Sequence, residues 1–310
     1  MAKKATRQAY GEALCSLAEK YDFLVLDADL AAATKTEIFK KAYPERFFDT
    51  GIAEGNMMSV AAGIATTGKP VFASSFAMFA AGRSYEQIRN SIAYPHLNVK
   101  IGATHAGITV GEDGATHQCI EDLALMRGIP GMTVINPADA VETYAAVEFA
   151  LNFDGPVYLR FSRLATEEIF DSSYKFTLGK GQILIEGSDV TIISTGIMAT
   201  AAIEAADALK KEGIKARVVN MASIKPIDEE LIIKCAKETG AIVTVEDHSI
   251  IGGLGTAVSE VIAEKAPCIL RRIGVRDVFG RSGKPADLFK YYHMTSDDIA
   301  SSAKEAIKLK

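Results

Sequence analysis

The 310-residue sequence lacks the basic surface that nucleic acids and anionic membranes require. Its 39 acidic residues outnumber its 34 lysines and arginines, which gives a formal net charge of −5. Basic residues never run longer than a pair, as at Lys3 and Lys4 or at Arg271 and Arg272. Because phosphate groups are bound by stripes of lysine and arginine, we expect neither a nucleic-acid partner nor a membrane partner.

Long apolar runs are absent as well. A membrane-spanning helix needs about 18 or more apolar residues in succession, and a secretory signal peptide needs an apolar stretch of roughly 7–15 residues near the N-terminus. The sequence shows neither feature, and we therefore predict a cytoplasmic protein.

Cysteine is scarce: four residues, at positions 15, 119, 235 and 268, form no CxxC pair. This spacing gives no support for a disulfide framework or a zinc knuckle, and it is typical of reduced thiols. His105 and His117 lie near Cys119, but their spacing matches no common metal-ligand pattern. We therefore predict no metal site within this chain.

The sequence does contain a regular alternation of two patterns. Short apolar runs rich in β-branched residues predict buried strands, and longer amphipathic stretches such as 140–151 and 199–213 predict helices. This alternation is typical of parallel sheets covered by helices on both faces, the α/β class. The predicted strands are 23–29, 70–75, 99–104, 132–137, 156–162, 190–196, 215–221, 241–247 and 268–275.

A polar, glycine-containing stretch at 166–182 interrupts the alternation. It predicts two domains, over 1–165 and 186–310, with a linker over 166–185. Each domain is expected to hold a mainly parallel sheet of four or five strands, flanked by its own helices.

Polar side chains gather where strands of the first domain end. Ligands of parallel α/β sheets bind in loops beyond the carboxyl ends of strands, and the segments 27–36, 73–82 and 160–163 follow strands in this way. So does the stretch 104–118, THAGITVGEDGATHQ, which carries His105, Glu112, Asp113 and His117 among three glycines. Glycine lets the backbone approach a ligand closely, so this composition indicates a polar binding loop.

Several further candidates have two interpretations each. Glu54 precedes a helical pattern of small and apolar residues, where it either complements the helix dipole or serves as a proton donor in an apolar pocket. Phe76 and Phe79 belong either to the core or to a pocket for a planar ring. Arg7 and Arg163 are either solvated or form a clamp for a phosphate or carboxylate.

The segment 250–258, IIGGLGTAV, partly matches a dinucleotide-binding fingerprint. It lacks the full GxGxxG spacing and the acidic residue that would bind a ribose. Tight packing of a strand on a helix explains its glycines better. Glu246 and His248, just before it, are expected at an interface or at the rim of a site.

Taken together, these motifs resemble the C-terminal two-thirds of transketolase, and above all the small C-terminal subunit of transketolases whose chain is split in two. The segments that carry the resemblance follow the family's order across nearly the whole chain: DTGIAEGNMMSVAAGIA, SFAMFAAGRSYEQIRNSIAY, THAGITVGEDGATHQCIEDLALMRGIPGMTVINPAD and EDHSIIGGLGTAV. The resemblance implies a pyrimidine-binding domain over residues 1 to about 165, followed by a transketolase C-terminal domain. It also implies thiamine diphosphate and Mg²⁺ as cofactors.

The resemblance also implies roles for individual residues. In that family the glutamate at the position of Glu54 hydrogen-bonds the cofactor's aminopyrimidine and favours the tautomer that takes a proton from the thiazolium ring. Phe76 and Phe79 would pack on the aminopyrimidine. His105 and His117 would contact substrate oxygens and phosphate, and with Glu54 they are the implied catalytic residues.

The remaining implied roles concern the substrate. Asp113 would bind a sugar hydroxyl, Arg7 and Arg163 would hold the sugar phosphate, and Asp29 would lie near the acceptor channel. The implied reaction moves a two-carbon ketol unit from a ketose phosphate to an aldose phosphate.

The chain departs from the family pattern at two places. Ala33 stands where the family usually has a serine that assists phosphate binding, so this contact is lost or comes from Thr34 or Lys35. Nothing in the sequence matches the GDG segment, followed by an asparagine, that holds the diphosphate through a metal. We therefore expect an N-terminal partner subunit to bind Mg²⁺, the isolated chain to be inactive, and the assembly to be a dimer or a heterotetramer.

Three alternatives remain open. 1-Deoxyxylulose-5-phosphate synthase normally has DRAG where this chain has THAG, and β subunits of 2-oxoacid dehydrogenases normally lack the GEDGATHQ loop. A catalytically silent scaffold of the same fold would have no need of Glu54 together with His105, Asp113 and His117.

Overall fold

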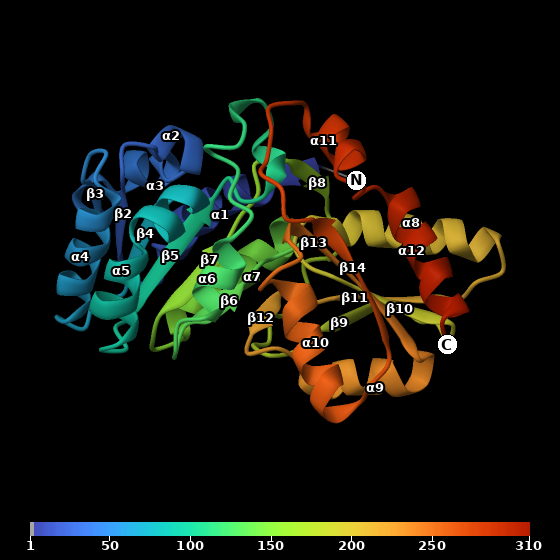
Figure 1. Ribbon diagram of the computed structural model, residues 1–310. Helices are drawn as coiled ribbons and strands as arrows, with labels where there is room; N and C mark the ends of the chain where they lie inside the picture. Colours follow the sequence, from blue (N-terminus) through green and yellow to red (C-terminus); the bar gives the residue numbers. More distant parts are fainter. Residues whose placement is uncertain (1–2) are drawn as a thin grey trace.

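The computed structural model describes residues 3–310, which form two α/β lobes side by side (Figure 1). The first lobe holds a seven-stranded sheet in the order β12-β6-β7-β5-β4-β2-β3, and the second a five-stranded sheet in the order β14-β13-β10-β11-β9. All neighbouring strands in these sheets are parallel except at the edges, where β12 and β9 pair antiparallel. The predicted α/β class with mainly parallel sheets is confirmed.

The strands are short, as buried parallel strands commonly are. They are β1 (Lys3–Ala5), β2 (Leu24–Asp27), β3 (Phe47–Asp49), β4 (Val71–Phe76), β5 (Val99–Thr104), β6 (Thr133–Ile135), β7 (Val157–Arg160), β8 (Ala165–Glu167), β9 (Gln182–Ile185), β10 (Val190–Ser194), β11 (Ala216–Asn220), β12 (Ser223–Lys225), β13 (Ala241–Ser249) and β14 (Ile269–Val275).

The helices separate the strands along most of the chain. They are α1 (Thr6–Leu17), α2 (Ala31–Thr34), α3 (Glu37–Ala42), α4 (Glu54–Ala65), α5 (Tyr85–Gln87), α6 (Asp122–Arg127), α7 (Ala140–Asn152), α8 (Met198–Lys211), α9 (Glu229–Thr239), α10 (Leu254–Lys265), α11 (Pro285–Tyr291) and α12 (Ser296–Lys308). Short 3₁₀ turns are η1 (Pro44–Arg46) and η4 (Ile108–Asp113), and π-helical turns are η2 (Met78–Arg83) and η3 (Ile88–Ala93).

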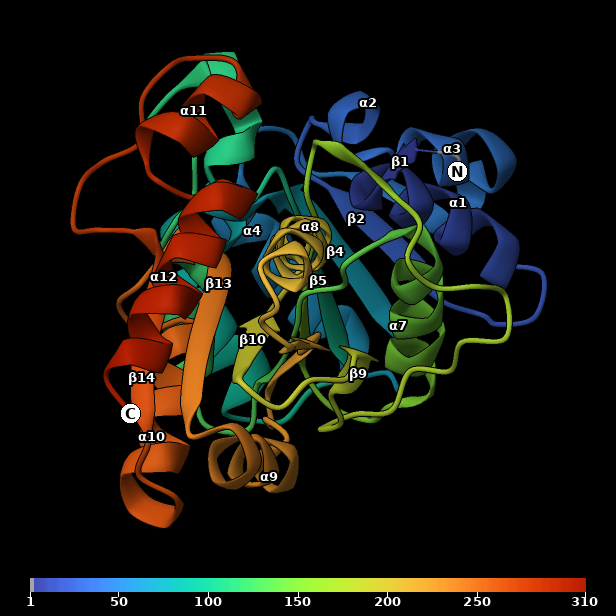
Figure 2. The ribbon, with the colours of Figure 1, turned by 90° about the vertical axis from the view of Figure 1, so that its right-hand side faces the viewer.

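Both large sheets are covered on both faces, which explains the continuous apolar strands. Helices α1 and α7 cover one face of the first sheet (Figure 2), and α4, α6 and the two π-helical turns cover the other. In the second lobe, α8 and α12 lie on one face, and α9 and α10 lie on the other. The central strands β4 and β5 are therefore buried along their whole length.

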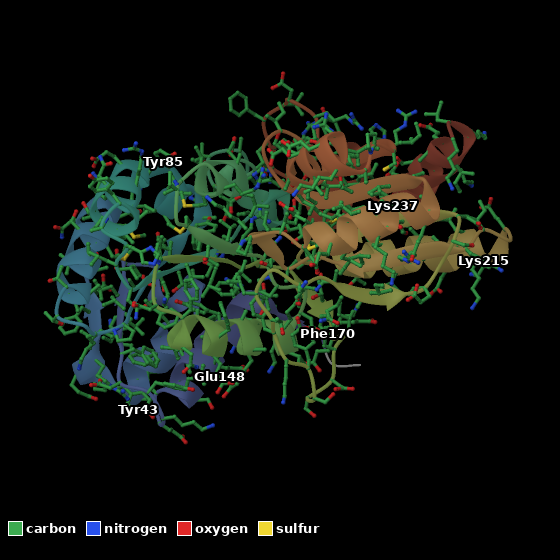
Figure 3. All side chains as sticks on the ribbon, turned by 90° about the horizontal axis from the view of Figure 1, so that it is seen from below. Tyr43, Tyr85, Glu148, Phe170, Lys215 and Lys237 are labelled. Atoms are coloured by element: carbon green, nitrogen blue, oxygen red, sulfur yellow. The ribbon has the colours of Figure 1, made fainter. Side chains whose placement is uncertain are left out.

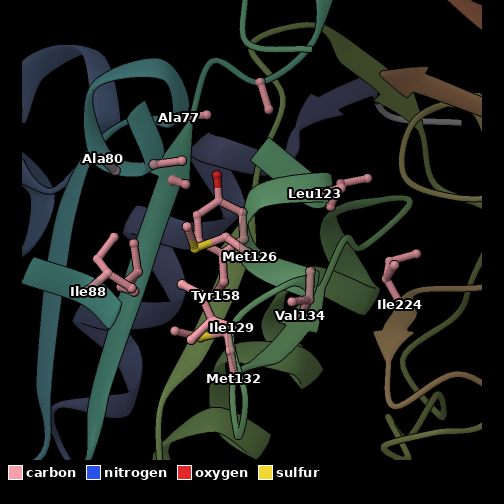
Figure 4. Close-up of a cluster of buried hydrophobic side chains, with 14 of the residues drawn as sticks. Ala77, Ala80, Ile88, Leu123, Met126, Ile129, Met132, Val134, Tyr158 and Ile224 are labelled. Carbon is pink, nitrogen blue, oxygen red and sulfur yellow. The ribbon is translucent and has the colours of Figure 1, made fainter. Parts of the chain in front are cut away.

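The two lobes share one hydrophobic core. A single cluster of buried side chains runs from Met126, Val134 and Tyr158 of the first lobe to Ile224 on β12 and on to the α9 and α10 face of the second sheet (Figure 4). Strand β12 comes from the second half of the chain but pairs with β6. The first sheet has seven strands, where we expected four or five, because the short strand β3 lies at one edge and β12, from the second half of the chain, lies at the other.

The predicted linker, 166–185, is only partly irregular. It overlaps two strands at its ends: β8 pairs with β1, and β9 joins the second sheet. Between them, residues 168–181 form neither helix nor strand.

Outside the core, charged side chains such as Lys215 and Lys237 occupy exposed positions of the second lobe (Figure 3). Across residues 3–310, every helix is too short or too polar to cross a membrane.

Candidate active site

The loops that follow β2, β4, β5 and β7 meet at one end of the first sheet, as the sequence predicted. Three residues of these loops, Asp29, Lys35 and His105, have φ angles of 61°, 73° and 57°. Residues other than glycine rarely adopt positive φ. Such conformations persist where the surrounding structure fixes them, which is common at functional sites.

Glu54 is the first residue of α4, and its side chain borders a pocket at this end of the sheet. The residue is only 4% exposed, and Arg83 Nη1 donates a hydrogen bond to Oε1 at 3.1 Å. The guanidinium carbon of Arg83 lies 4.1 Å from the centre of the Phe79 ring. Glu54, Phe79 and Asp29 thus share one pocket of about 230 Å³, lined by Ala28, Asp29, Leu30, Ile52, Glu54, Phe79 and Arg83.

Phe76 and Phe79 stack on each other instead of enclosing a gap. Their ring centres lie 5.7 Å apart with 16° between the planes. A third ring between them would need about 7 Å, twice the ~3.5 Å contact distance between carbon atoms. Phe76 also stacks on His105, with ring centres 3.8 Å apart. A planar ligand in the pocket would therefore contact Phe79, with Phe76 as its support.

His105 is buried, and its neighbours fix its tautomer. Arg7 Nη1 lies 2.9 Å from Nε2, and because a guanidinium can only donate, Nε2 must be the acceptor. Nδ1 therefore carries the proton and donates to Thr104 Oγ1 at 2.8 Å. Burial, together with the charges of Arg7 and Arg163, lowers the pKa of His105 to about 3. The ring is neutral at physiological pH.

Arg7 and Arg163 come together beside His105, as the clamp hypothesis required. Their neighbours Thr6 and Ser162 are joined directly, since Ser162 N donates to Thr6 Oγ1 at 2.7 Å. Burial and the charge of Arg163 lower the pKa of Arg7. Arg163 Nη1 also lies 3.8 Å from Glu112 Oε2, so the positive charge of the pair already attracts a carboxylate.

The loop 104–118 divides into a buried half and an exposed half. Ile108 and Thr109 are buried, although the composition of the stretch pointed to a loop outside the core, whereas Glu112 and Asp113 are exposed. His117 is half-buried and meets the edge of Phe79 at 5.3 Å and 69°. The buried half is held by hydrogen bonds, and His117 of the other half lies beside Phe79 of the pocket.

Asp27, which the sequence analysis did not single out, organises the loop after β2. Its Oδ1 accepts from Leu30 N at 2.7 Å, and its Oδ2 accepts from the hydroxyls of Thr34 and Thr36 at 2.8 and 2.9 Å. Burial raises the pKa of this carboxyl to about 6. An acid at the end of an apolar strand, followed by two threonines, was the signal in the sequence.

The same loop shows what replaces the family serine. At Ala33 the backbone carbonyl accepts from Arg7 Nη1 at 2.8 Å. Position 33 therefore contacts Arg7 through its backbone carbonyl. Thr34 is engaged with Asp27.

Glu246 explains the glycine-rich segment 250–258. Its carboxylate accepts from Leu254 N at 2.7 Å and Gly255 N at 2.8 Å, at the N-terminus of α10. A Cβ on Gly253 would lie 2.0 Å from Glu246 Oε2, so only glycine permits this approach. The carboxylate occupies the place a phosphate would take, which supports packing over nucleotide binding. Glu246 and His248 are buried between the lobes and do not lie at a rim.

The described residues, 3–310, contain no group of three or more His, Cys, Asp or Glu side chains placed to hold a metal ion. Cys119, considered above with the two histidines, lies in the apolar core.

Comparison with known proteins assigns both lobes to one family. Residues 2–168 match the family described as "Transketolase, pyrimidine binding domain", and residues 179–299 match "Transketolase, C-terminal domain". A Methanocaldococcus jannaschii protein described as a transketolase C-terminal section is 55% identical over 309 residues, which cover 98% of this chain and 97% of that protein.

Two further relatives match over nearly their whole length. A protein of Clostridium sp. (strain MSTE9) described as a 6-deoxy-6-sulfo-D-fructose transketolase subunit is 45% identical over 305 residues, covering 98% of this chain and 95% of its own. A solved structure described as a split gene transketolase, inactive β4 tetramer, superposes with a TM-score of 0.93 at 54% identity, with 99% of each chain covered. These matches confirm the resemblance seen in the motifs, and the chain belongs to the transketolase family.

Proposed function

We propose that this chain is the C-terminal subunit of a split transketolase, which transfers a two-carbon ketol unit from a ketose phosphate to an aldose phosphate together with an N-terminal subunit. The observation that carries the proposal is the pocket in which the carboxylate of Glu54 lies beside the ring face of Phe79. The relatives described as a transketolase section, a transketolase subunit and a split gene transketolase support it.

The residues of the pocket fit the aminopyrimidine ring of thiamine diphosphate. The position of Arg83 shows what kind of group fits the pocket, because its planar guanidinium stacks on Phe79 and donates an N–H to Glu54. A flat heterocycle that bears N–H groups would make the same two contacts. Arg83 has to leave this position when such a ring binds. Once bound, the cofactor would supply an electron sink for cleaving and forming the ketol carbon–carbon bond.

In this proposal Glu54 holds a proton between its carboxylate and the ring nitrogen it faces. Phe79 fixes the plane of the cofactor ring. Phe79 in turn stacks on Phe76, and Phe76 stacks on His105, so the three rings form a stacked row. His105 offers Nε2 as an acceptor, since its Nδ1 proton is committed to Thr104. A substrate hydroxyl could replace Arg7 as the donor to that nitrogen.

The polar groups around this row would orient the sugar. Arg7 and Arg163 would bind its anionic end, His117 and Asp113 would contact its oxygens, and Asp29 would face the acceptor. An arginine pair selects for negative charge more than for phosphorus. The description of the Clostridium relative names a sulfo sugar, which carries an anionic group that such a clamp would also bind.

The N-terminal partner would cover the open side of the pocket and supply the diphosphate and Mg²⁺ site, for which this sequence has no GDG motif. Ile52, which lines the pocket, is 76% exposed, and Phe48 is 47% exposed. Large exposed apolar side chains beside a site are typical of an interface. We therefore propose a heterotetramer with two chains of each kind.

The test is Glu54→Gln in the complex with the partner, assayed with thiamine diphosphate and Mg²⁺. General acid–base groups contribute about 10²–10⁴-fold, so kcat should fall by at least ~100-fold. Glu212→Gln, the same change at an exposed position of the second lobe, should keep full activity. An E54Q complex within a few-fold of wild type would remove Glu54 from the mechanism.

A further inference from the structure

The second sheet presents its ligand-binding end to the first lobe. In doubly wound sheets, ligands bind where the strand order reverses, and here this point lies between β10 and β13, because β11 follows on the other side of β10. At the end of β10, Gly196 N donates to Asn136 O at 3.2 Å, and Asn136 Nδ2 donates to Thr195 Oγ1 at 3.2 Å. Protein from the first lobe fills the crevice.

Asp247, near the end of β13, reaches from this crevice into the loop 104–118. Its Oδ1 accepts from Ile108 N at 2.9 Å, and its Oδ2 accepts from Thr109 Oγ1 at 3.0 Å. Asp247 is buried. Gly107 has a φ of 78°, and a Cβ there would lie 2.1 Å from Asp247 Oδ2. The carboxylate of Asp247 therefore packs so closely on the loop that only glycine fits at position 107.

A second set of contacts holds Asp247 itself in place. Arg160 of β7 donates from Nη2 to the carbonyl oxygen of Asp247 at 2.9 Å. The same guanidinium binds Asp122 through Nε at 2.8 Å and Nη2 at 3.1 Å, and Tyr158 donates its hydroxyl to Asp122 at 2.9 Å. All four side chains are buried, so the strand end that carries Asp247 is rigid.

We propose that Asp247 is a positioning residue through which the C-terminal domain sets the conformation of the site loop. His105, with its positive φ, lies three residues before the amide that Asp247 binds, and Asp113 and His117 follow it. The C-terminal domain thereby takes part in assembling the substrate side of the site, beyond any role in subunit association. The effect on substrate rests on the proposed function, whereas the effect on the loop does not.

Hydrogen exchange of the full chain tests the loop directly. Asp247→Ala removes both acceptors, so exchange of amides in residues 105–118 should quicken by about tenfold or more, the effect of one buried hydrogen bond. Asp228→Ala is the matched control, since buried Asp228 accepts from Leu231 N and Gly181 N away from the loop. It should leave exchange in 105–118 unchanged. Unchanged exchange in folded D247A would overturn the proposal.

The active complex supplies a second readout. Asp247→Asn keeps the shape and one carbonyl acceptor, so it should fold and show an intermediate change in exchange, and it decides the question if D247A does not fold. Its KM for the sugar phosphate should rise severalfold, while its Kd for thiamine diphosphate stays at the wild-type value, because Asp247 touches the loop and not the Glu54 pocket. An equal loss of affinity for the sugar phosphate and for thiamine diphosphate would overturn the positioning role. If wild-type complex shows no ketol transfer, the proposed function fails, and exchange still decides the inference.

Discussion

His105 shows how neighbours determine the chemistry of a single residue. Its Nε2 faces Arg7, and its Nδ1 faces Thr104. Protonation would place a hydrogen on Nε2 against a group that can only donate, in a buried position. The histidine is thereby kept as a neutral acceptor, in contrast to a solvated histidine, which is protonated in mild acid.

This environment predicts a pH dependence of stability. The pKa of His105 is about 3 in the folded chain, against about 6.5 for an unperturbed histidine. As pH falls below ~6.5 the unfolded chain binds the proton first, so this group destabilises the fold progressively down to pH ~3. His105→Asn should therefore lose less stability than wild type between pH 6.5 and 4 in urea unfolding. Parallel pH curves for the two proteins would contradict the assignment.

The sequence singled out Glu54, Phe79 and Asp29, which line the candidate pocket, but not the residues that support them. Glu54, Phe79 and Asp29 carry chemistry next to predicted strand ends, and parallel topology brings such residues together. Arg83 was missed because it ends a π-helical turn, whose wider winding cannot be seen in a periodicity. Asp247 was missed because its partner Ile108 lies 139 residues away in the sequence.

Among the elements, the direction of strand pairing separates the strands that could be predicted from those that could not. All nine predicted runs overlap a strand of the structure. The strands β1, β8, β9 and β12 were not predicted, because they pair antiparallel with distant segments, and the alternation of strands and helices in the sequence indicates only parallel pairing. Two of them, β8 and β9, overlap the ends of the predicted linker.

Helix α7 illustrates how a cap can tie an irregular segment to the core. Asp139 is buried and accepts from Glu142 N at 2.8 Å as the N-cap of the helix. Its second oxygen accepts from Ile169 N at 2.7 Å and Phe170 N at 2.9 Å. One carboxylate thus anchors both the helix and the chain that leads to the second lobe.

Asp139→Ala should lower the free energy of unfolding by about 2–4 kcal/mol, from a lost cap of ~1 kcal/mol and buried amides left without acceptors. Denaturant unfolding measures this directly. Asp171→Ala, an exposed turn residue of the same segment, is the control and should leave the midpoint unchanged. Equal effects of the two substitutions would show that Asp139 does not anchor the segment.

At the scale of the whole molecule, the two lobes act as one unit with an open site. They share a continuous apolar core, and strand β12 of the second half pairs with β6 in the first sheet. Arg160 of the first lobe also binds both Asp122 and the backbone of Asp247. The pocket holds the groups proposed for the aminopyrimidine, and most of the groups proposed for the sugar lie on the loops beside it. The sequence has no GDG segment, so we expect a second chain to supply the site for the diphosphate and Mg²⁺.

The most direct measurement is a titration of this chain with the subunit that co-purifies with it and carries GDG followed by asparagine, assayed for ketol transfer with thiamine diphosphate and Mg²⁺. The account predicts no transfer by either chain alone, activity that rises until the two chains are equimolar, and its loss on chelation with recovery on adding Mg²⁺. Full activity of this chain alone, or an inert equimolar complex, would contradict it.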